Sequence, residues 1–282
     1  MNVRLFDIQR VSTVDGPGIR TTVFFKGCNL KCLWCHNPES QSGGKQLLYY
    51  QDKCTHCGLC RSVCPNDLAA CSHCGQCEKV CPNDARSICG KDYTIAEVMD
   101  IVMKDEKFYR YSGGGVTFSG GECMLQLDGL RVLLRECKRN GINTAVDTAG
   151  NVPFSSFERI REYTDIFLYD IKCMDPQRHE RFTGVDNLRI LSNLTKLLQT
   201  GARLHIRIPI IPTVNESLVE MLKVKGFFDE NGWPESIELL PYHRMGERKA
   251  IALCSPAPSF EIPSRAKLEE LQAVLGEKCV IR

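Results

Sequence analysis

Residues 19–36 read IRTTVFFKGCNLKCLWCH and combine an apolar, β-rich run with three closely spaced cysteines. The run 19–26 predicts a buried strand. Cys28, Cys32 and Cys35 follow it in a C-x3-C-x2-C pattern that offers three thiolates and no obvious fourth. An iron–sulfur cluster held by three cysteines keeps one coordination position open for a small ligand, as a catalytic zinc site does. A structural site completed by a distant ligand such as His36 is the alternative.

Beyond residue 90, short β-rich runs alternate with amphipathic helical patterns, which is typical of βα units around a parallel sheet. We predict strands at 19–26, 115–118, 144–147, 166–170, 204–209, 237–240 and 279–282, and helices at 94–107, 125–139, 154–163, 187–199, 216–231 and 264–275. Six such repeats predict an α/β fold, a partial (β/α)6 TIM-like barrel. The chemistry of such a barrel is expected at the carboxyl ends of the strands, where the βα loops gather.

Eight further cysteines form two copies of the pattern C-x2-C-x2-C-x3-C-P between residues 54 and 81. This pattern is typical of bacterial two-cluster ferredoxins, in which the fourth cysteine of each copy ligates the other cluster. We therefore assign one 4Fe-4S cluster to Cys54, Cys57, Cys60 and Cys81, and a second to Cys71, Cys74, Cys77 and Cys64. Zinc is the alternative, but a structural zinc site typically takes its four ligands as two separate pairs of closely spaced residues. The predicted organisation is the start of the barrel at 1–50, a ferredoxin-like insert at 51–90 and the rest of the barrel at 91–282.

The composition argues against several classes of protein. The 282 residues carry 36 Lys plus Arg against 34 Asp plus Glu, so no basic excess indicates nucleic-acid binding. The chain contains no long apolar run and no apolar signal core near residue 1, so we expect a cytoplasmic protein without a membrane span. In a reducing compartment the 17 cysteines indicate metal sites before disulfides. The six cysteines outside the motifs are interpreted as buried packing residues.

Trp34 before the last cysteine of the loop completes a wider pattern. The segment VDGPGIRTTVFFKGCNLKCLWCHNPES at residues 14–40 resembles the opening of glycyl radical enzyme activating enzymes, which belong to the radical S-adenosylmethionine (SAM) superfamily and include pyruvate formate-lyase activating enzyme. The resemblance continues through SGGE at 119–122, DTAG at 147–150, YDIK at 169–172, IRIPIIPTVN at 206–215 and ELLPYHRMG at 238–246. It therefore covers nearly the whole chain.

The resemblance implies a radical SAM oxidoreductase with a protein substrate. In that family, SAM chelates the open iron, and an electron from the cluster breaks a carbon–sulfur bond. The resulting 5'-deoxyadenosyl radical takes a Cα hydrogen from one glycine of a partner glycyl radical enzyme. The implied cofactors are SAM, three 4Fe-4S clusters and a monovalent cation. We expect flavodoxin or ferredoxin as the electron donor, and a monomeric chain.

The same resemblance implies a set of SAM-binding residues. The glycines of SGGE admit close backbone approach to the ligand's amino group. Two strand-end aspartates hold the cation, and two basic residues face the methionine carboxylate. The set is Trp34, Cys35, His36, Gly120, Gly121, Glu122, Asp147, Asp170, Ile171, Lys172, Arg207 and His243. The alternatives are an ordinary βα turn for the glycines, a helix cap for Asp147 and solvated rim charges for Lys172 and Arg207.

The loop 15–20 precedes the first predicted barrel strand. Its glycines and proline are typical of a turn. The resemblance further implies that this loop faces the glycyl loop of the partner, through Asp15, Gly16, Gly18 and Arg20. We expect the partner to open in order to present its glycine.

The eight-cysteine insert departs from the best-studied pyruvate formate-lyase activator, which lacks it. Only six residues, 65–70, separate Cys64 from Cys71, so a regular ferredoxin strand pairing stays an open question. Electron delivery to the radical cluster is the predicted role, and shaping of the partner-docking surface is the alternative. An iron–sulfur electron-transfer protein and a radical enzyme acting on a small molecule are the competing functions.

Overall fold

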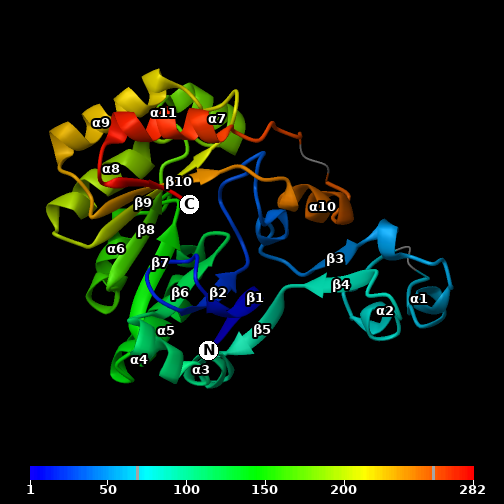
Figure 1. Ribbon diagram of the computed structural model, residues 1–282. Coiled ribbons are helices and arrows are strands. Elements are labelled where there is room, and N and C mark those ends of the chain that lie inside the picture. The colour runs from blue at the N-terminus through cyan, green and yellow to red at the C-terminus, as the bar shows by residue number, and fades with distance from the viewer. Residues whose placement is uncertain (68–69, 256–257) are drawn as a thin grey trace.

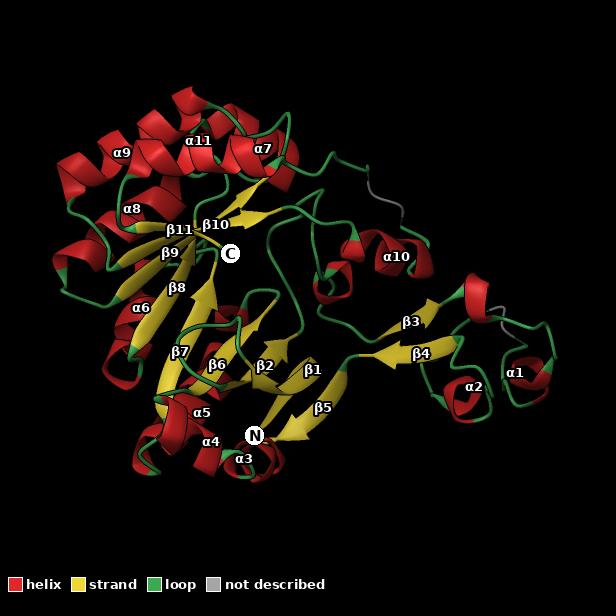
Figure 2. Cartoon of the chain, viewed as in Figure 1, coloured by secondary structure: helices red, strands yellow, loops and turns green. Residues whose placement is uncertain are grey.

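The computed structural model describes residues 1–67, 70–255 and 258–282. Within these residues a nine-stranded sheet forms the centre of the fold (Figure 1, Figure 2). Seven strands run parallel and are neighbours in chain order: β2 (Arg20–Phe25), β6 (Gly115–Gly120), β7 (Asn143–Thr148), β8 (Ile166–Asp170), β9 (Leu204–Ile210), β10 (Ser236–Pro241) and β11 (Cys279–Ile281). β1 (Asn2–Ser12) and β5 (Lys91–Thr94) extend the β2 edge in antiparallel pairing. The predicted partial (β/α)6 barrel is confirmed.

Helices cover one face of this sheet and leave the other face for the site. Along β9 the apolar side chains, including Leu204 and Ile206, are buried in the main core, whereas Arg207 alternates to the opposite face. The helices outside the arm are α3 (Ile95–Met103), α4 (Glu106–Ser112), α5 (Leu127–Arg139), α6 (Phe154–Ile160), α7 (Pro176–Thr183), α8 (Leu188–Gln199), α9 (Leu218–Asn231), α10 (Met245–Ala252) and α11 (Arg265–Leu275). Of these, α10 does not cover the sheet but lies between the barrel and the arm (Figure 1). Short 3-10 turns occur at η1 (Pro38–Ser40), η2 (Gln51–Lys53), η3 (Cys123–Gln126) and η4 (Arg161–Tyr163).

The predicted helix 94–107 is interrupted at residues 104–105, because the chain breaks there between α3 and α4. Asp105 lies at the break and is completely buried. Its carboxylate accepts hydrogen bonds from Arg10 Nη2 at 2.5 Å and from Thr21 Oγ1 at 2.7 Å. A buried carboxylate requires such partners, and they lie on β1 and β2. The break therefore turns Asp105 toward the sheet.

Residues 46–89 form a projection that we call the arm (Figure 1). Its base is a two-stranded antiparallel ribbon of β3 (Gln46–Tyr49) and β4 (Arg86–Cys89). The ribbon carries two short helices, α1 (Leu59–Ser62) and α2 (Gln76–Lys79). No strand forms in the described residues between β3 and β4, so strand pairing here lies outside the cysteine repeats.

The two cysteine repeats of the arm have matching backbones. His56 and His73 have positive φ angles of 56° and 53°, and each N–H donates to a cysteine Sγ two residues earlier at 3.4 Å. Asp67 and Asp84 likewise have φ angles of 44° and 50°. Non-glycine residues rarely adopt this region, so its recurrence at equivalent positions indicates that the same local fold forms twice.

Helix α10 connects the arm to the barrel. Arg248 Nη2 lies 2.6 Å from Asp52 Oδ2, and the guanidinium lies over the ring of Tyr50 at 5.4 Å. One turn further along, Ala252 packs against Leu48 and Cys89 of the ribbon. The arm is thus anchored to the barrel on the α10 side.

Candidate active site

The three-cysteine loop follows β2 at the carboxyl edge of the sheet. Its backbone is held by α7, since Lys31 N–H donates to Thr183 O at 2.6 Å and Leu33 N–H donates to Phe182 O at 3.0 Å. Gly246 of α10 packs against the carbonyl of Cys35, where a Cβ would lie only 2.2 Å from the oxygen. Neither α7 nor α10 was predicted from the sequence pattern, yet both position the loop.

The three thiols of this loop lie in a partly desolvated site. Burial raises the pKa of Cys28 to about 11 and of Cys32 to about 12, and it also raises the pKa of Cys35. The positive charge of Lys172 opposes this shift at all three cysteines. Buried thiolates need compensating positive charge, which bound iron supplies. The donor set therefore fits a 4Fe-4S cluster with three protein ligands.

A group of four charged side chains lies near the loop. Asp147 and Asp170 lie at the carboxyl ends of β7 and β8, Lys172 follows β8, and Arg207 lies midway along β9. Lys172 Nζ donates to Asp170 Oδ2 at 2.8 Å. Arg207 Nη2 lies 3.5 Å from Asp147 Oδ2, and Arg207 Nε lies 3.6 Å from Asp170 Oδ1. Arg207 Nε and Asp170 Oδ1 are buried and lack a hydrogen-bond partner among the described residues. Each of these two atoms thus lacks a hydrogen bond, although they form a long ion pair with one another.

Burial and charge act in opposite directions on the pKa values of this group. Burial raises the pKa of Asp147 to about 6, although Arg207 opposes the shift and Ser119 Oγ donates to the carboxylate at 2.5 Å. The carboxylates of Asp147 and Asp170 raise the pKa of Arg207 despite its burial. A cation bound between the aspartates would further stabilise their ionised forms.

Gly120 and Gly121 make close approaches, but to the chain's own backbone. Gly120 has a φ of +117°, and a Cβ there would lie 2.3 Å from Phe25 N; a Cβ on Gly121 would lie 2.2 Å from Gly27 O. These glycines therefore let β6 and its loop pack against the start of the cysteine loop. From the sequence, these glycines are explained by close approach to a ligand. The structure adds a second reason, which is close packing against the chain's own backbone.

Glu122 is completely buried and links two strand-end loops. Its Oε2 accepts from Thr148 Oγ1 at 2.8 Å and from Ala149 N–H at 3.1 Å, and its Oε1 accepts from Met124 N–H at 3.2 Å. Burial raises the pKa of Glu122 to about 7, while these three donors act in the opposite direction. In the structure the side chain of Glu122 fixes the loops after β6 and β7 to one another.

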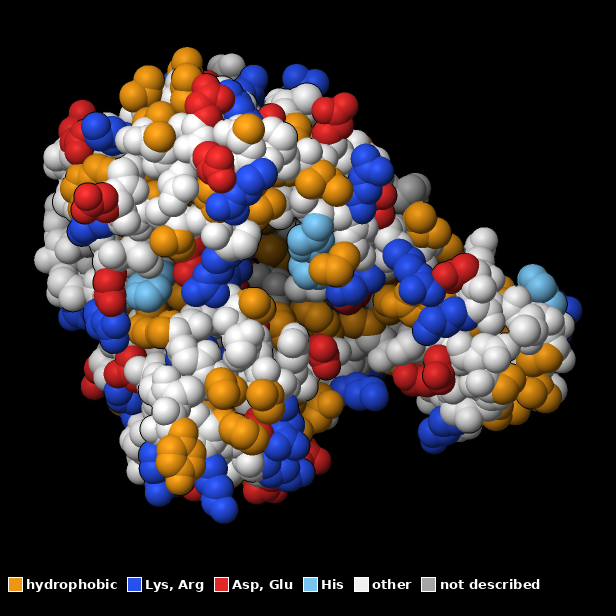
Figure 3. All heavy atoms as spheres, viewed as in Figure 1, with side chains coloured by type: hydrophobic (Ala, Val, Ile, Leu, Met, Phe, Trp, Pro, Cys, Tyr) orange, Lys and Arg blue, Asp and Glu red, His pale blue; other side chains and the backbone are white. Residues whose placement is uncertain are grey.

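Aromatic and apolar residues complete the surroundings of the cysteine loop. Trp34 packs in a small core with Phe182 and Phe260, at ring distances of 6.4 and 6.3 Å. The rings of His36 and His243 meet edge to face at 4.4 Å, and burial lowers the pKa of His36 to about 4. Figure 3 shows a hollow in this face of the barrel with histidine side chains at its edge. Ile171, between Asp170 and Lys172, is buried at 2% exposure.

The loop 15–20 folds against the interior face of the barrel. Asp15 is partly exposed and accepts from Ser12 Oγ and Thr22 Oγ1, both at 2.7 Å. Its charge acts on Asp147 and Arg207, so it lies within electrostatic reach of the charged group.

Two of the four residues of this loop that the sequence singles out are buried. Arg20 is completely buried, and its guanidinium donates to Thr117 Oγ1, Val116 O and Pro17 O at 2.7, 2.8 and 3.1 Å. Gly16 is also buried, whereas Gly18 is partly exposed. Arg20 thus supports the loop from beneath, and Asp15 is its accessible charged side chain.

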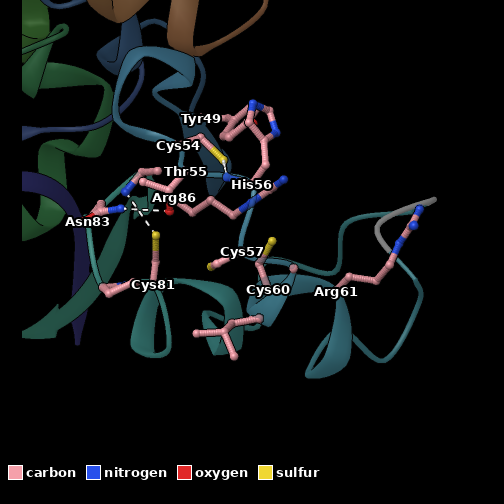
Figure 4. A pocket seen from close by; sticks show the side chains of 14 residues that line it. Tyr49, Cys54, Thr55, His56, Cys57, Cys60, Arg61, Cys81, Asn83 and Arg86 are labelled. Atoms are coloured by element: carbon pink, nitrogen blue, oxygen red, sulfur yellow. Dashed lines mark hydrogen bonds between the residues drawn. The ribbon is translucent and has the colours of Figure 1, made fainter.

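The arm contains two cavities that separate its cysteines into two sets. The first cavity, of about 200 Å³, is lined by Cys54, Cys57, Cys60 and Cys81 (Figure 4). The second, of about 40 Å³, is lined by Cys64, Cys71, Cys74 and Cys77. In each cavity the fourth cysteine comes from the other repeat. In the described residues, no three His, Cys, Asp or Glu side chains lie close enough together to bind a single metal ion.

Comparison with known families identifies the class of protein. The family model of the "Radical SAM superfamily" matches residues 61–224, more than half of the chain, and that of the "4Fe-4S binding domain" matches residues 48–69. The chain belongs to the radical SAM superfamily, whose domain implies SAM and a 4Fe-4S cluster; the second match indicates an additional cluster. None of the helices in the described residues is long and apolar enough to cross a membrane.

Individual relatives narrow this class. The chain is 42% identical to trans-4-hydroxy-L-proline dehydratase activating enzyme of Clostridioides difficile, over 96% of this chain and 95% of that protein. It is also 42% identical to choline trimethylamine-lyase activating enzyme of Oleidesulfovibrio alaskensis, over 96% and 94%. A crystal structure of a domain of pyruvate-formate lyase-activating enzyme from Bacteroides vulgatus is 30% identical, with a TM-score of 0.52, and covers 60% of this chain and 99% of that one. Within the superfamily, the chain is a glycyl radical enzyme activating enzyme.

Proposed function

We propose that this protein installs a glycyl radical on a partner enzyme by reductive cleavage of SAM and removal of a Cα hydrogen from one glycine. The observation that carries the proposal is the pairing of the three-cysteine loop with the charged group from β7, β8 and β9. In that group, Arg207 Nε and Asp170 Oδ1 are buried without hydrogen-bond partners among the described residues. A zwitterionic amino-acid ligand beside an open iron would use such groups.

Each part of the site has a role in this proposal. Cys28, Cys32 and Cys35 hold the radical cluster. Arg207 and Lys172 bind the methionine carboxylate, and Asp147 with Asp170 holds a monovalent cation beside it. When bound, the cluster and SAM supply one electron and a 5'-deoxyadenosyl radical, and the products are methionine, 5'-deoxyadenosine and a glycyl radical.

The remaining predicted ligand-binding residues shape the pocket around these groups. The loop of Gly120, Gly121 and Glu122 forms one wall of the ligand pocket, near the amino group. Trp34 and Ile171 support the pocket from their buried positions, and His36 and His243 line its rim.

The partner presents its glycine along the interior face of the barrel. Asp15 is the loop residue that contacts the partner, Gly16 and Gly18 give the loop its path, and Arg20 holds it in place. The named relatives activate different enzymes at similar identity, which supports a glycyl radical enzyme as partner without selecting one.

The arm, predicted as the insert 51–90 between barrel segments 1–50 and 91–282, holds two auxiliary 4Fe-4S clusters. Its two cavities contain the two cysteine sets in the crossed arrangement typical of two-cluster ferredoxins, which supports this assignment. The arm receives electrons from flavodoxin or ferredoxin and passes them to the radical cluster of a monomeric, cytoplasmic enzyme. Shaping of the partner-docking surface is the rival role of the arm.

The direct test is anaerobic incubation of the reconstituted protein with SAM, a reductant and a candidate glycyl radical enzyme from the same organism. The proposal predicts equal amounts of 5'-deoxyadenosine and methionine, together with a glycyl radical seen by electron paramagnetic resonance. Continued SAM cleavage that is stimulated by a small molecule but leaves no radical on the partner would contradict it.

A further inference from the structure

The ribbon at the base of the arm has two different faces. In its antiparallel register Leu47 lies opposite Ile88, and Tyr49 lies opposite Arg86. Because side chains alternate along a strand, these four share one face. Leu47 and Ile88 line the second cysteine cavity, and Tyr49 lines the first. This face of the ribbon therefore forms the wall behind both cysteine sets.

Arg86 is the one described residue that lines both cavities. Its guanidinium lies over the ring of its cross-strand neighbour Tyr49, 4.3 Å from the ring centroid. Figure 4 shows it in the first cavity together with Tyr49 and the four cysteines of that set. A planar guanidinium stacks well on an aromatic ring, which fixes its position between the two sets.

The charge of Arg86 is not neutralised by a carboxylate in the described part of the chain. None of the ion pairs there involves Arg86, whereas Arg61, which also lines the first cavity, pairs with Asp67 at 3.0 Å. The first repeat has Ala69 at the position equivalent to Arg86. Among the described residues of the arm, the cation between the two cavities therefore comes from the second repeat alone.

Arg86 lies beside cysteines of both sets. It lines the first cavity together with Cys54 and Cys81, and the second together with Cys64 and Cys77. One guanidinium thus places its positive charge next to both cavities.

We propose that Arg86 sets the reduction potentials of both arm clusters. The proposal rests on the proposed function, because it requires that the arm holds two 4Fe-4S clusters. Reduction adds one negative charge to a cluster, and net charge close to the cluster is one determinant of its potential. A fixed cation between the two sites therefore stabilises both reduced states and makes the arm easier to reduce by an external donor.

The experiment is a redox titration followed by electron paramagnetic resonance, in the full-length Cys32→Ala background, where the arm clusters give the signals. Arg86→Gln should lower both midpoint potentials by about 59 mV, which is a tenfold change in a one-electron reduction equilibrium. Arg86→Met should give the same decrease, and Arg86→Lys should retain most of the wild-type value. The matched control is Arg61→Gln, which removes the same charge from a side chain that is 71% exposed.

Each outcome of this titration decides the proposal. Unchanged potentials in Arg86→Gln, or an equal decrease in Arg61→Gln or Arg86→Lys, would overturn it. Loss of arm iron from both neutral variants would make Arg86 a structural residue and would also overturn it. Fewer than about eight irons per chain in the Cys32→Ala protein itself would instead contradict the proposed pair of auxiliary clusters.

Discussion

The barrel loop and the arm both present cysteines at close spacing, but the chain builds the two sites in different ways. The barrel loop is held by tertiary contacts from α7 and α10 and faces four charged side chains from three strands. The arm instead repeats one local backbone twice, with several of its cysteines exposed to solvent. A site assembled from many elements can position a ligand beside a metal cluster. A local repeat can bind clusters but supplies few groups for chemistry.

The two sites are nevertheless joined through one helix. α10 contacts the cysteine loop through Gly246 and the arm through Arg248. On the barrel side, Lys249 Nζ lies 2.7 Å from Glu39 Oε1, in the segment that follows the cysteine loop. The chain thus fixes the arm relative to the radical site.

The largest expected difference between the sites comes from Cys32→Ala. Because the barrel loop has only three ligands, the loss of one should remove its cluster and abolish SAM cleavage, while the arm keeps about eight of about twelve irons. Iron analysis and quantification of 5'-deoxyadenosine check this result. Cys254→Ala is the control and should behave as wild type. Cys254 is the one of the six cysteines outside the motifs that is exposed, so its predicted burial is wrong. SAM cleavage that survives in Cys32→Ala would mean that the barrel loop is not the reactive site.

Arg207→Met tests the charged group that the arm lacks. Removal of the cation leaves Asp147 buried without an ion-pair partner and Asp170 with Lys172 alone, which should lower the free energy of unfolding by about 3–5 kcal/mol and weaken SAM binding more than tenfold. Denaturant unfolding and equilibrium dialysis measure the two effects. Arg203→Met is the control, because its pair with Glu235 is exposed and should change stability by about 1 kcal/mol or less. Equal effects of the two substitutions would contradict a specific role of the charged group in SAM binding.

Glu122→Gln tests the effect of burial in the barrel site, through the pH dependence of stability. Folding raises the pKa of Glu122 to about 7 from an ordinary value near 4.5, so the folded protein holds a proton that the unfolded chain releases in this window. The free energy of unfolding of the wild type should therefore decrease by about 3 kcal/mol, relative to that of Glu122→Gln, as pH rises from 4.5 to 7. Above pH 7 the difference between the two proteins should stay constant. Urea unfolding at several pH values checks this slope. Glu158→Gln, at an exposed carboxylate, should keep the wild-type slope.

Cys57→Ala and Cys74→Ala test the arm, with the smallest expected effect. Both variants should bind SAM normally and complete a first turnover with a chemical reductant, because neither residue contributes to the barrel site. Multiple turnover with a protein electron donor should fall severalfold. Comparison of burst and steady-state rates measures this effect. Unchanged steady-state rates would favour the docking role of the arm over electron delivery.

The sequence predicts local patterns better than it predicts the contacts that assemble the site. Alternation in IRIPI and the repeated C-x2-C-x2-C-x3-C-P pattern are local, so β9 and the grouping of cysteines in the arm could be read from them. The capping pair Thr94 and Glu97 also forms at the start of α3. In each case the determining residues are neighbours in the chain.

The missed features depend on residues far apart in the chain. α7 and α10 are helices of only eight residues, and their role follows from contacts with the cysteine loop. The break at Asp105 is set by Arg10 and Thr21, more than 80 positions away. The complete burial of Arg20 depends likewise on Thr117. No local pattern contains this information.

The central claim is that the barrel site removes a Cα hydrogen from a glycine of a partner protein, and isotope transfer tests it most directly. A glycyl radical enzyme from the same organism, on which this protein installs a radical, would be prepared with glycine deuterated at Cα and activated once with unlabelled SAM. The account predicts one deuterium in each 5'-deoxyadenosine formed, detected by mass spectrometry, together with the glycyl radical. Unlabelled 5'-deoxyadenosine formed at the same rate would contradict the account.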